Sequence, residues 1–312
     1  MKTRILILGV SSFAGSSFAY FLSQYKQYQV FGTYNSKKNL KKLIISKSKN
    51  KIDFFQLDLS RDNNNLLDIV QKIKPRFIFD FASVCMVNES WFDPNYYFRV
   101  NVISKINLIK NLHKFKFLNK FIYISTPEIF GSTAYPVKEN EKKFNPSTPY
   151  AVSKLTLEKL LINYNNSFAK KSIIARFTNF YGRGQLGHRL IPKLINFIDN
   201  KKKFPLQGRG LSKRDFIFDE DFNNGLLKVM NLGKNGSIYH FSTNSYFTIR
   251  DVIEKICKLK GVKFNNVVQV VKDRIGKDKN YFLDNKKTSI ELKWKPKNKL
   301  PFGLKKIIDY YR

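Results

Sequence analysis

Cysteine and histidine are scarce in this sequence, which has two of the former and three of the latter among 312 residues. The cysteines, Cys85 and Cys257, lie far apart and form no C-x-x-C pair. A disulfide framework and a zinc site are therefore excluded, because each needs more ligands than the chain offers. We expect no bound metal, and a reducing compartment, the cytoplasm, as the location.

Acidic residues are also few: 23 Asp and Glu stand against 57 Lys and Arg, which gives a formal net charge of +34. Basic surfaces bind nucleic acid by releasing counterions from phosphate groups. Here, however, the lysines are scattered along the whole chain and form no basic tail. This distribution favours a general compositional bias and not a nucleic-acid partner, and it leaves an anionic substrate open.

Long apolar runs are missing as well, since no stretch approaches the ~18 apolar residues of a spanning helix. The N-terminus runs directly into a strand-like segment at residues 4–8 without the apolar core of a signal peptide. We therefore expect no membrane insertion and no export. Hydrophobic residues still make up 43% of the chain and aromatic residues 15%, which is enough to bury the core of a globular protein.

In the first half of the chain, short apolar runs alternate with longer amphipathic stretches. The runs predict strands at residues 4–8, 29–33, 53–57, 77–82, 121–125 and 173–177. The stretches predict helices at residues 13–25, 66–72, 97–113 and 150–168, because apolar residues recur there at three- and four-residue steps. This alternation is typical of a Rossmann-like, doubly wound parallel sheet of the α/β class.

After residue 178 the alternation becomes irregular, with a helix predicted at residues 190–198. We expect a dinucleotide-binding domain at residues 1–178. A smaller, mainly C-terminal α+β domain for the substrate would follow at residues 179–312, with some chain crossing back to the first domain.

The first predicted strand ends in a glycine-containing turn that precedes a helix, Gly9-Val10-Ser11-Ser12-Phe13-Ala14-Gly15. Gly9 permits a tight turn, Gly15 permits close packing of helix on strand, and amides at a helix N-terminus favour a pyrophosphate. Ser12 occupies the place of the middle glycine of the usual fingerprint. The turn predicts a dinucleotide site, and a purely structural turn is the alternative.

The end of the second strand lacks the acidic residue that usually holds the adenosine ribose of NAD. The chain reads Thr33-Tyr34-Asn35-Ser36-Lys37-Lys38 at this point. The missing carboxylate and the nearby lysines leave NADP open beside NAD. Asp58, after the third strand, is a candidate for the adenine amine, although an Asp at a strand end is often only a loop or cap residue.

Tyr150 and Lys154 are four residues apart in a predicted helix and therefore share one face. An ammonium near a phenol favours the ionised phenol, which can accept a hydroxyl proton while hydride leaves the same carbon. Thr126 ends an earlier strand and is placed to hydrogen-bond the same hydroxyl. Together the three residues predict a catalytic group for alcohol oxidation.

At this point the sequence resembles the extended short-chain dehydrogenase/reductases of the NAD-dependent epimerase/dehydratase family, and most closely the pattern of dTDP-glucose 4,6-dehydratases. The motifs that carry the resemblance extend over nearly the whole chain. They are residues 9–15, 80–83, 101–102, 125–131, 149–154, 179–182, 190–192, 214–216, 273–278 and 294–296.

The resemblance implies a tightly held nicotinamide cofactor that is reduced and reoxidised within one turnover. Tyr150 would take the C4 hydroxyl proton, Lys154 would hold the nicotinamide ribose and lower the pKa of Tyr150, and Thr126 would orient the C4 oxygen. The implied cofactor contacts are Gly9, Ser11, Ser12, Phe13, Ala14, Gly15, Asp58, Leu59, Phe81, Ala82, Ser83, Asn101, Tyr150 and Lys154.

Glu128 matches the base that removes the C5 proton in the family, after which water leaves from C6 and hydride returns there. The implied contacts with the nucleotide-diphosphate sugar are Ser125, Asn179, Arg189, Leu190, Arg214 and Arg274. The resemblance also implies a homodimer formed through the helices at residues 97–113 and 150–168, and a role in polysaccharide biosynthesis.

Two departures from the dTDP-glucose pattern affect the chemistry. Pro127 stands where an Asp usually protonates the leaving C6 hydroxyl, so Glu128 would act first as base and then as acid. Cys85 stands where a His is common. Glu128 favours dehydration over 4-epimerisation, and decarboxylation and 4-keto reduction are further alternatives within the family. A non-catalytic relative that senses the cofactor or binds nucleic acid is the alternative of another class.

Overall fold

The computed structural model describes residues 2–36, 40, 43–48, 50–61, 65–273 and 278–311. Its largest element is a seven-stranded sheet with the strand order β10-β6-β5-β4-β1-β2-β3, in which each paired strand runs parallel to its neighbour. The strands are β1 (Thr3–Leu8), β2 (Tyr28–Tyr34), β3 (Asp53–Gln56), β4 (Phe77–Asp80), β5 (Lys120–Ser125), β6 (Ser172–Phe177) and β10 (Ile238–Phe241). The predicted doubly wound α/β fold is confirmed.

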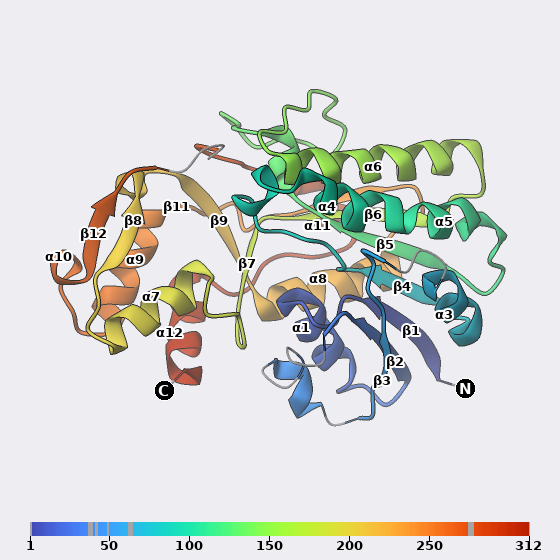
Figure 1. Ribbon diagram of the computed structural model, residues 1–312, viewed down its shortest axis with the longest axis horizontal. Coiled ribbons are helices and arrows are strands. Elements are labelled where there is room, and N and C mark those ends of the chain that lie inside the picture. Colours follow the sequence, from blue (N-terminus) through green and yellow to red (C-terminus); the bar gives the residue numbers. More distant parts are fainter. Residues whose placement is uncertain are drawn as a thin grey trace.

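Helices cover both faces of this sheet (Figure 1). Ile5 and Ile7 of β1 belong to the apolar cluster of one face, with α1 (Phe13–Leu22) and α8 (Asp219–Leu232). Leu6 and Leu8 belong to the cluster of the other face, with α3 (Asn65–Ile73), α5 (Ser104–Asn111) and α6 (Pro149–Ser167). This alternation explains why β1 is apolar from Ile5 to Leu8, since a strand segment buried on both faces needs no polar side.

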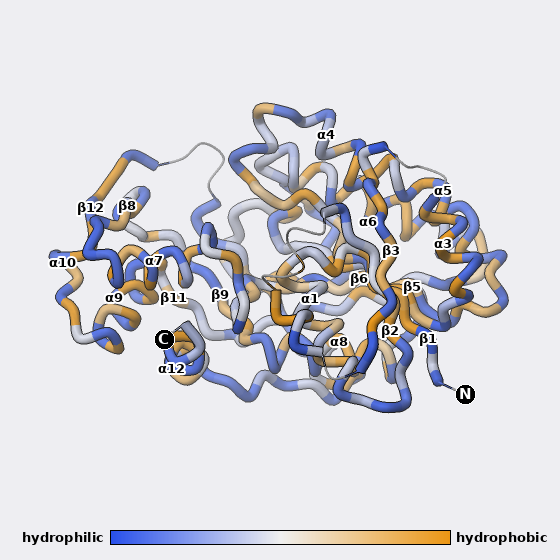
Figure 2. The backbone as a smooth tube through the Cα atoms, turned by 60° about the horizontal axis from the view of Figure 1, so that its bottom comes forward, coloured by the Kyte–Doolittle hydropathy of each residue, from blue (hydrophilic) through white to orange (hydrophobic). Residues whose placement is uncertain are grey.

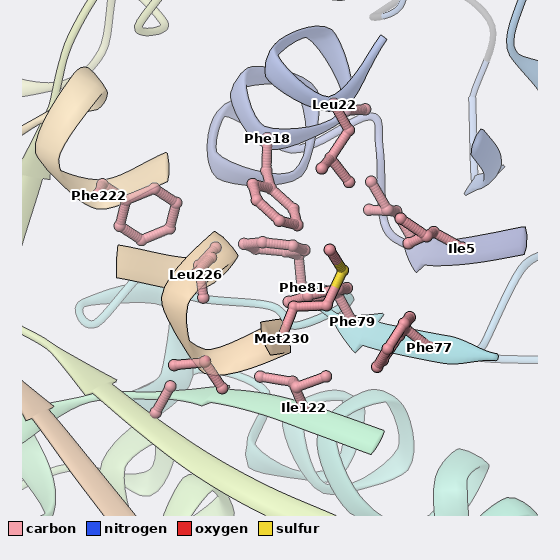
Figure 3. Close-up of a cluster of buried hydrophobic side chains, with 14 of the residues drawn as sticks. Ile5, Phe18, Leu22, Phe77, Phe79, Phe81, Ile122, Phe222, Leu226 and Met230 are labelled. Carbon is pink, nitrogen blue, oxygen red and sulfur yellow. The ribbon is translucent and has the colours of Figure 1, made fainter. Parts of the chain in front are cut away.

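Aromatic side chains fill much of the first of these clusters (Figure 3). Phe18 of α1 lies 4.6 Å from Phe79 of β4 between ring centroids, and Phe81 lies 6.2 Å from Phe222 of α8. Figure 2 shows hydrophobic stretches along the strands of the large sheet and hydrophilic ones along many of the loops around it. The core therefore holds α1 and α8 against the strands whose ends form the site described below.

A smaller lobe lies beside the large sheet (Figure 1). Its three-stranded sheet contains β7 (Asn179–Tyr181), β9 (Lys213–Phe218) and β11 (Tyr246–Thr248), and β8 (Phe204–Gln207) pairs in parallel with β12 (Val268–Val271). Four helices, α7 (Leu190–Asp199), α9 (Ile249–Leu259), α10 (Phe264–Val267) and α12 (Leu300–Tyr310), complete it. Its apolar core is separate from the two clusters of the large sheet.

The second half of the chain contributes to both lobes. β10 is a strand of the large sheet, α8 packs on the face of that sheet, and α11 (Lys286–Glu291) contacts β10. Asp215 of β9 joins the lobes, because its buried carboxylate accepts hydrogen bonds from Thr178, Ser242 and Thr243. The boundary at residue 178 stays a prediction. No helix in the described ranges is both long and apolar enough to cross a membrane.

Candidate active site

Gly9 directly follows β1 and starts the turn that leads into α1. Its φ is +80°, a conformation that glycine adopts without the steric cost that a Cβ brings. Its N–H donates to the Thr33 Oγ1 at 3.1 Å. Ser12 caps α1, since its Oγ donates to the Gly9 carbonyl at 2.8 Å and accepts from the Gly15 N–H at 3.0 Å. Ser12 therefore holds the turn although it replaces a glycine.

The turn also approaches the end of the neighbouring strand β4. A Cβ placed on Gly9 would lie 2.8 Å from the Ala82 Cα, closer than real Cβ atoms come to other atoms. The ends of β1 and β4 thus meet backbone to backbone, which only glycine allows at this position.

These two strand ends border a cleft of about 290 Å³. It is lined by Gly9, Ser11, Ser12, Thr33, Tyr34, Asn35, Leu57, Asp58, Leu59, Phe81, Ala82, Ser83, Val84, Tyr96 and Val100. Most of the predicted cofactor contacts outside the catalytic helix are among them. Phe13, Ala14 and Gly15 form the first turn of α1 instead, where Phe13 stacks on Phe180 with ring centroids 4.4 Å apart.

The cleft fits a dinucleotide at the carboxyl ends of the parallel strands. The N-terminus of α1 lies at its rim, where helix amides and the helix dipole favour a phosphate group. Gly9 leaves room for a ligand to approach the backbone closely. These features agree with the predicted cofactor contacts, which remain predictions residue by residue.

Asp58 lies at the β3 side of the cleft. Its Oδ1 accepts hydrogen bonds from the Ser60 hydroxyl at 2.6 Å and the Ser60 N–H at 2.9 Å, and Arg61 lies 3.7 Å from its Oδ2. The hydrogen bond from the Ser60 hydroxyl is the main cause that lowers the pKa of Asp58. Asp58 is therefore a charged loop carboxylate at the cleft. Lys37 and Lys38, which left NADP open, lie outside the described residues.

Asn101 does not line the cleft but fixes the loop that does. Its Oδ1 accepts from the Val84 N–H at 2.8 Å, and its Nδ2 donates to the Val84 carbonyl at 3.1 Å and the Ser153 Oγ at 2.9 Å. The helix predicted at residues 97–113 is present, but it contains a π-helical turn that the spacing did not predict. The chain forms α4 (Pro94–Phe98), a π-helical turn (Arg99–Ile103) and α5, and the wide turn carries the inward-facing Asn101.

Tyr150 lies in the first turn of α6, which Thr148 caps by accepting from the Ala151 N–H at 3.2 Å. Its side chain is buried, and burial is the main reason that its pKa is raised well above 10. The charge of Glu128 raises the pKa further, while Arg189 and a hydrogen bond with Thr126 lower it. The structure thus brings together Tyr150, Thr126 and Glu128, as the sequence predicts.

Lys154 lies one turn further along α6 and is fully buried there. Its ammonium donates to the Ser83 Oγ at 3.0 Å and to the Ile124 carbonyl at 2.8 Å. Burial lowers the pKa of Lys154 to about 7. The ammonium is therefore directed to the cleft-lining loop, and its effect on the pKa of Tyr150 stays a prediction.

Ser125 ends β5, and Thr126 and Glu128 lie in the segment that follows it. Thr126 caps a short 3-10 helix (Pro127–Phe130) and accepts from the Glu128 N–H at 3.3 Å. Ser125 Oγ is buried without a hydrogen-bond partner among the described residues, which leaves it available to a ligand. Pro127 is buried beside these residues and offers no acidic side chain.

Of the predicted substrate contacts Asn179, Arg189 and Leu190 in the smaller lobe, the structure places Arg189 near this region. Asn179 begins β7, and Arg189 precedes α7. The Arg189 guanidinium contacts the Cys85 Sγ at 2.9 Å. Leu190 packs against the core of the smaller lobe and is partly buried. Arg189 and Cys85 therefore lie close to Tyr150, on whose pKa both act.

Arg214 is buried and engaged by the chain itself. Its guanidinium donates to the carbonyls of Lys213 at 2.8 Å, Lys279 at 3.0 Å and Asp278 at 2.7 Å, and it lies 4.0 Å from the centroid of the Tyr281 ring. Arg214 thus anchors the segment at residues 278–281, and its predicted contact with phosphate stays untested. Arg274 lies outside the described residues.

Over the described ranges, no group of three or more His, Cys, Asp or Glu side chains is arranged to hold a metal ion.

A family model described as GDP-mannose 4,6 dehydratase matches residues 6–307. The chain belongs to this family. The resemblance to the NAD-dependent epimerase/dehydratases that the motifs carry is thereby confirmed at the level of the family.

Three similar proteins illustrate the range of activities among its relatives. The trifunctional UDP-glucose 4,6-dehydratase/3,5-epimerase/reductase RHM3 of Arabidopsis thaliana is 30% identical over 98% of this chain and 47% of its own length. The dTDP-glucose 4,6-dehydratase of Salmonella typhimurium is 26% identical over 99% of this chain and 92% of its own. The UDP-glucuronic acid 4-epimerase of Bacillus cereus, solved with UDP-glucuronic acid and NAD, is 26% identical, has a TM-score of 0.89, and matches 99% of this chain and 98% of its own.

The chain spans about half the length of the first of these curated relatives.

The structure also shows residues near the site that the sequence did not single out. Tyr96 and Val100 line the cleft, and Asp80 forms a buried ion pair with Lys105 behind it. Val100 lies within the stretch predicted as a helix and Tyr96 lies just before it, and nothing in the pattern marks either residue. The ion pair joins residues 25 positions apart, and local spacing does not reveal such a contact. The one sign of it in the sequence is an Asp at the end of an apolar strand.

Proposed function

We propose that this chain is a nucleotide-sugar 4,6-dehydratase that holds NAD throughout its reaction. The observation that carries the proposal is the arrangement around Tyr150. Thr126 hydrogen-bonds the phenol, and the Glu128 carboxylate is close enough to raise its pKa. An acid/base carboxylate therefore lies beside the residues suited to alcohol oxidation, which dehydration needs and simple 4-epimerisation does not.

Bound NAD would accept hydride from C4 of the sugar and later return it to C6. Tyr150 takes the proton of the C4 hydroxyl while Thr126 holds the C4 oxygen in place. Because burial raises the pKa of Tyr150, the phenol needs a nearby positive charge to ionise. Arg189 supplies one such charge, and Lys154 supplies another when it is protonated.

The C4 ketone makes the C5 proton acidic, and Glu128 removes it. Pro127 cannot donate a proton, so Glu128 returns the same proton to the C6 hydroxyl, which leaves as water. Hydride then adds to C6 and a proton adds to C5. The proton that Tyr150 took from the C4 hydroxyl balances the one added at C5, and the net change is the loss of one water.

A 4-epimerase is the second candidate, and the observation that favours it is the strong structural similarity to the Bacillus cereus 4-epimerase. Decarboxylation and 4-keto reduction remain further alternatives within the family. The alternative of another class is a non-catalytic relative. Against it stands the joint presence of Tyr150, Thr126 and Glu128 in one buried site, which a binding module does not need.

The test is to incubate the purified protein with UDP-, dTDP-, GDP- and CDP-hexoses without added reductant and to follow the products by mass and NMR. Dehydration predicts loss of one water and a new C6 methyl signal. An unchanged mass with inverted C4 would instead establish epimerisation, and Glu128 would then be a binding residue. An unchanged substrate throughout the panel would favour the non-catalytic alternative. Loading the protein separately with NAD and NADP decides between the two cofactors.

We propose a homodimer through the face formed by α5 and α6. Ile103 of the π-helical turn, Ile106 of α5 and Val152 of α6 are 50%, 40% and 38% exposed, and a partner would cover these apolar side chains. A monomeric mass in light scattering at micromolar concentration would contradict this dimer.

We also propose the cytoplasm as the compartment, because Cys85 and Cys257 are free thiols. We propose polysaccharide biosynthesis as the use of the product.

A further inference from the structure

A buried ion pair lies directly behind the cleft-lining segment after β4. Lys105 Nζ lies 2.7 Å from Asp80 Oδ2, and both side chains are completely buried. Asp80 Oδ1 accepts from the Ala82 N–H at 3.0 Å, and Lys105 donates to the Ala82 carbonyl. The pair therefore hydrogen-bonds both the N–H and the carbonyl of Ala82. Because burying two charges costs free energy, such a pair adds little net stability to the fold, and stability alone does not explain its presence.

The same pair lies close to Lys154. Lys105 Nζ is 5.7 Å and Lys154 Nζ is 4.2 Å from the centroid of the Tyr123 ring, and Tyr123 itself is fully buried. Lys105 holds the loop at Ala82, and Lys154 holds it one residue later at Ser83. Two ammonium groups thus share one aromatic ring and one loop, and Asp80 is the carboxylate paired with the first of them.

The groups around Lys154 come from each element packed against it. After burial, Lys105 of α5 is the largest cause that lowers the pKa of Lys154. Asp80 of β4, Glu158 of α6 and Cys85 of the following loop raise it. Tyr123 of β5 faces it as a neutral ring, because burial raises the pKa of that phenol well above 10. Asp80 and Lys105 therefore act on Lys154 in opposite directions.

We propose that Asp80 and Lys105 are positioning residues of the candidate active site, which fix the backbone at Ala82 beside the cleft and set the charge around the Lys154 ammonium. The inference rests on the proposed function only for the catalytic role of Lys154. The ion pair sets the local charge without contacting the reacting atoms. Losing either partner changes the protonation of Lys154, and losing both leaves the charge balance close to the original.

The test compares Asp80→Asn, Lys105→Met and the double variant in the NAD-loaded protein. The 13Cε NMR signal of Lys154, assigned by its loss in Lys154→Arg, is titrated with pH. We expect Asp80→Asn to lower the pKa of Lys154 by about one pH unit or more, and Lys105→Met to raise it by a similar amount. The double variant should return near the original value. Lys51→Met, which removes an exposed lysine 3.5 Å from Asp53, is the control and should change nothing.

A second measurement covers the case in which the single variants do not fold. The double variant buries no unpaired charge but loses the Lys105 bond to the Ala82 carbonyl, so we expect its NAD affinity to fall about tenfold. Single variants that shift the titration in the same direction, or not at all, would overturn the inference. So would an NAD affinity of the double variant within about twofold of the original. Neither readout requires turnover, so a failed dehydratase assay leaves this test intact.

Discussion

A single substitution at Gly9 tests whether the cofactor cleft depends on the close approach of the turn after β1 to Ala82. Its φ is +80°, and an added Cβ would lie 2.8 Å from the Ala82 Cα and 2.9 Å from the Ala82 nitrogen. We expect Gly9→Ala to lower the free energy of unfolding by about 2–4 kcal/mol. About 1 kcal/mol of this reflects the left-handed backbone, and about 1–3 kcal/mol the displaced neighbour. Since Ala82 and Gly9 both line the cleft, NAD affinity should fall at least about tenfold.

Gly261 provides the matched control. Its φ is +68°, but no atom lies within 4 Å of the position of an added Cβ. Gly261→Ala should therefore cost only the backbone contribution of about 1 kcal/mol and leave NAD binding unchanged. Urea unfolding of both variants measures the stability difference, and calorimetric titration with NAD measures the affinity.

The reasoning would be refuted if the two variants were destabilised equally and both bound NAD with the original affinity. That result would mean that the approach of β1 to β4 at Ala82 is loose, and that the cleft does not depend on it.

Three further outcomes are expected. Tyr150→Phe should lower kcat by at least about 100-fold while nucleotide binding persists, and Thr126→Val should lower kcat less. Steady-state kinetics measure both effects, and an unchanged kcat in Tyr150→Phe would contradict the role assigned to Tyr150. The buried guanidinium of Arg176 lies 2.5 Å from the Glu158 carboxylate, so Glu158→Gln removes its counter-charge. We expect the free energy of unfolding, measured with urea, to fall by about 3–5 kcal/mol. A fall of less than about 1 kcal/mol would contradict a stabilising role of this ion pair. Burial holds the pKa of His240 well below 6.5, so below that pH the unfolded chain binds a proton that the folded chain does not. Stability should therefore fall as the pH drops from 7 to 5, and less so in His240→Gln; equal slopes would contradict this.

Periodicity alone predicted most of the large sheet. The six strands of the first half lie within a few residues of their predicted positions, because strands of a parallel sheet are buried on both faces and stand out as apolar runs. β10 was not predicted. Its four residues include Tyr239 and His240, and its place beside β6 depends on pairing across more than 60 residues of sequence.

The candidate site was predictable where chemistry follows local spacing. Tyr150 lies in the first turn of α6 and Thr126 directly follows β5, so their approach follows from the fold class. The direction in which a side chain turns did not follow in the same way. Lys154 donates hydrogen bonds to Ser83 and to the Ile124 carbonyl, and Arg214 donates to the Lys279 carbonyl. Buried donors bind the nearest acceptors, and the tertiary structure decides which acceptors these are.

The most direct test of the central claim uses a nucleotide hexose that carries deuterium at C4, taken from whichever substrate the panel identifies. The account predicts that the deuterium appears in the C6 methyl group of a product that has lost one water, because hydride removed from C4 returns to C6 within one site. Deuterium that returns to C4 of an inverted sugar would show epimerisation, and deuterium lost from the product would show that hydride is not retained. Either result would contradict the proposed dehydratase.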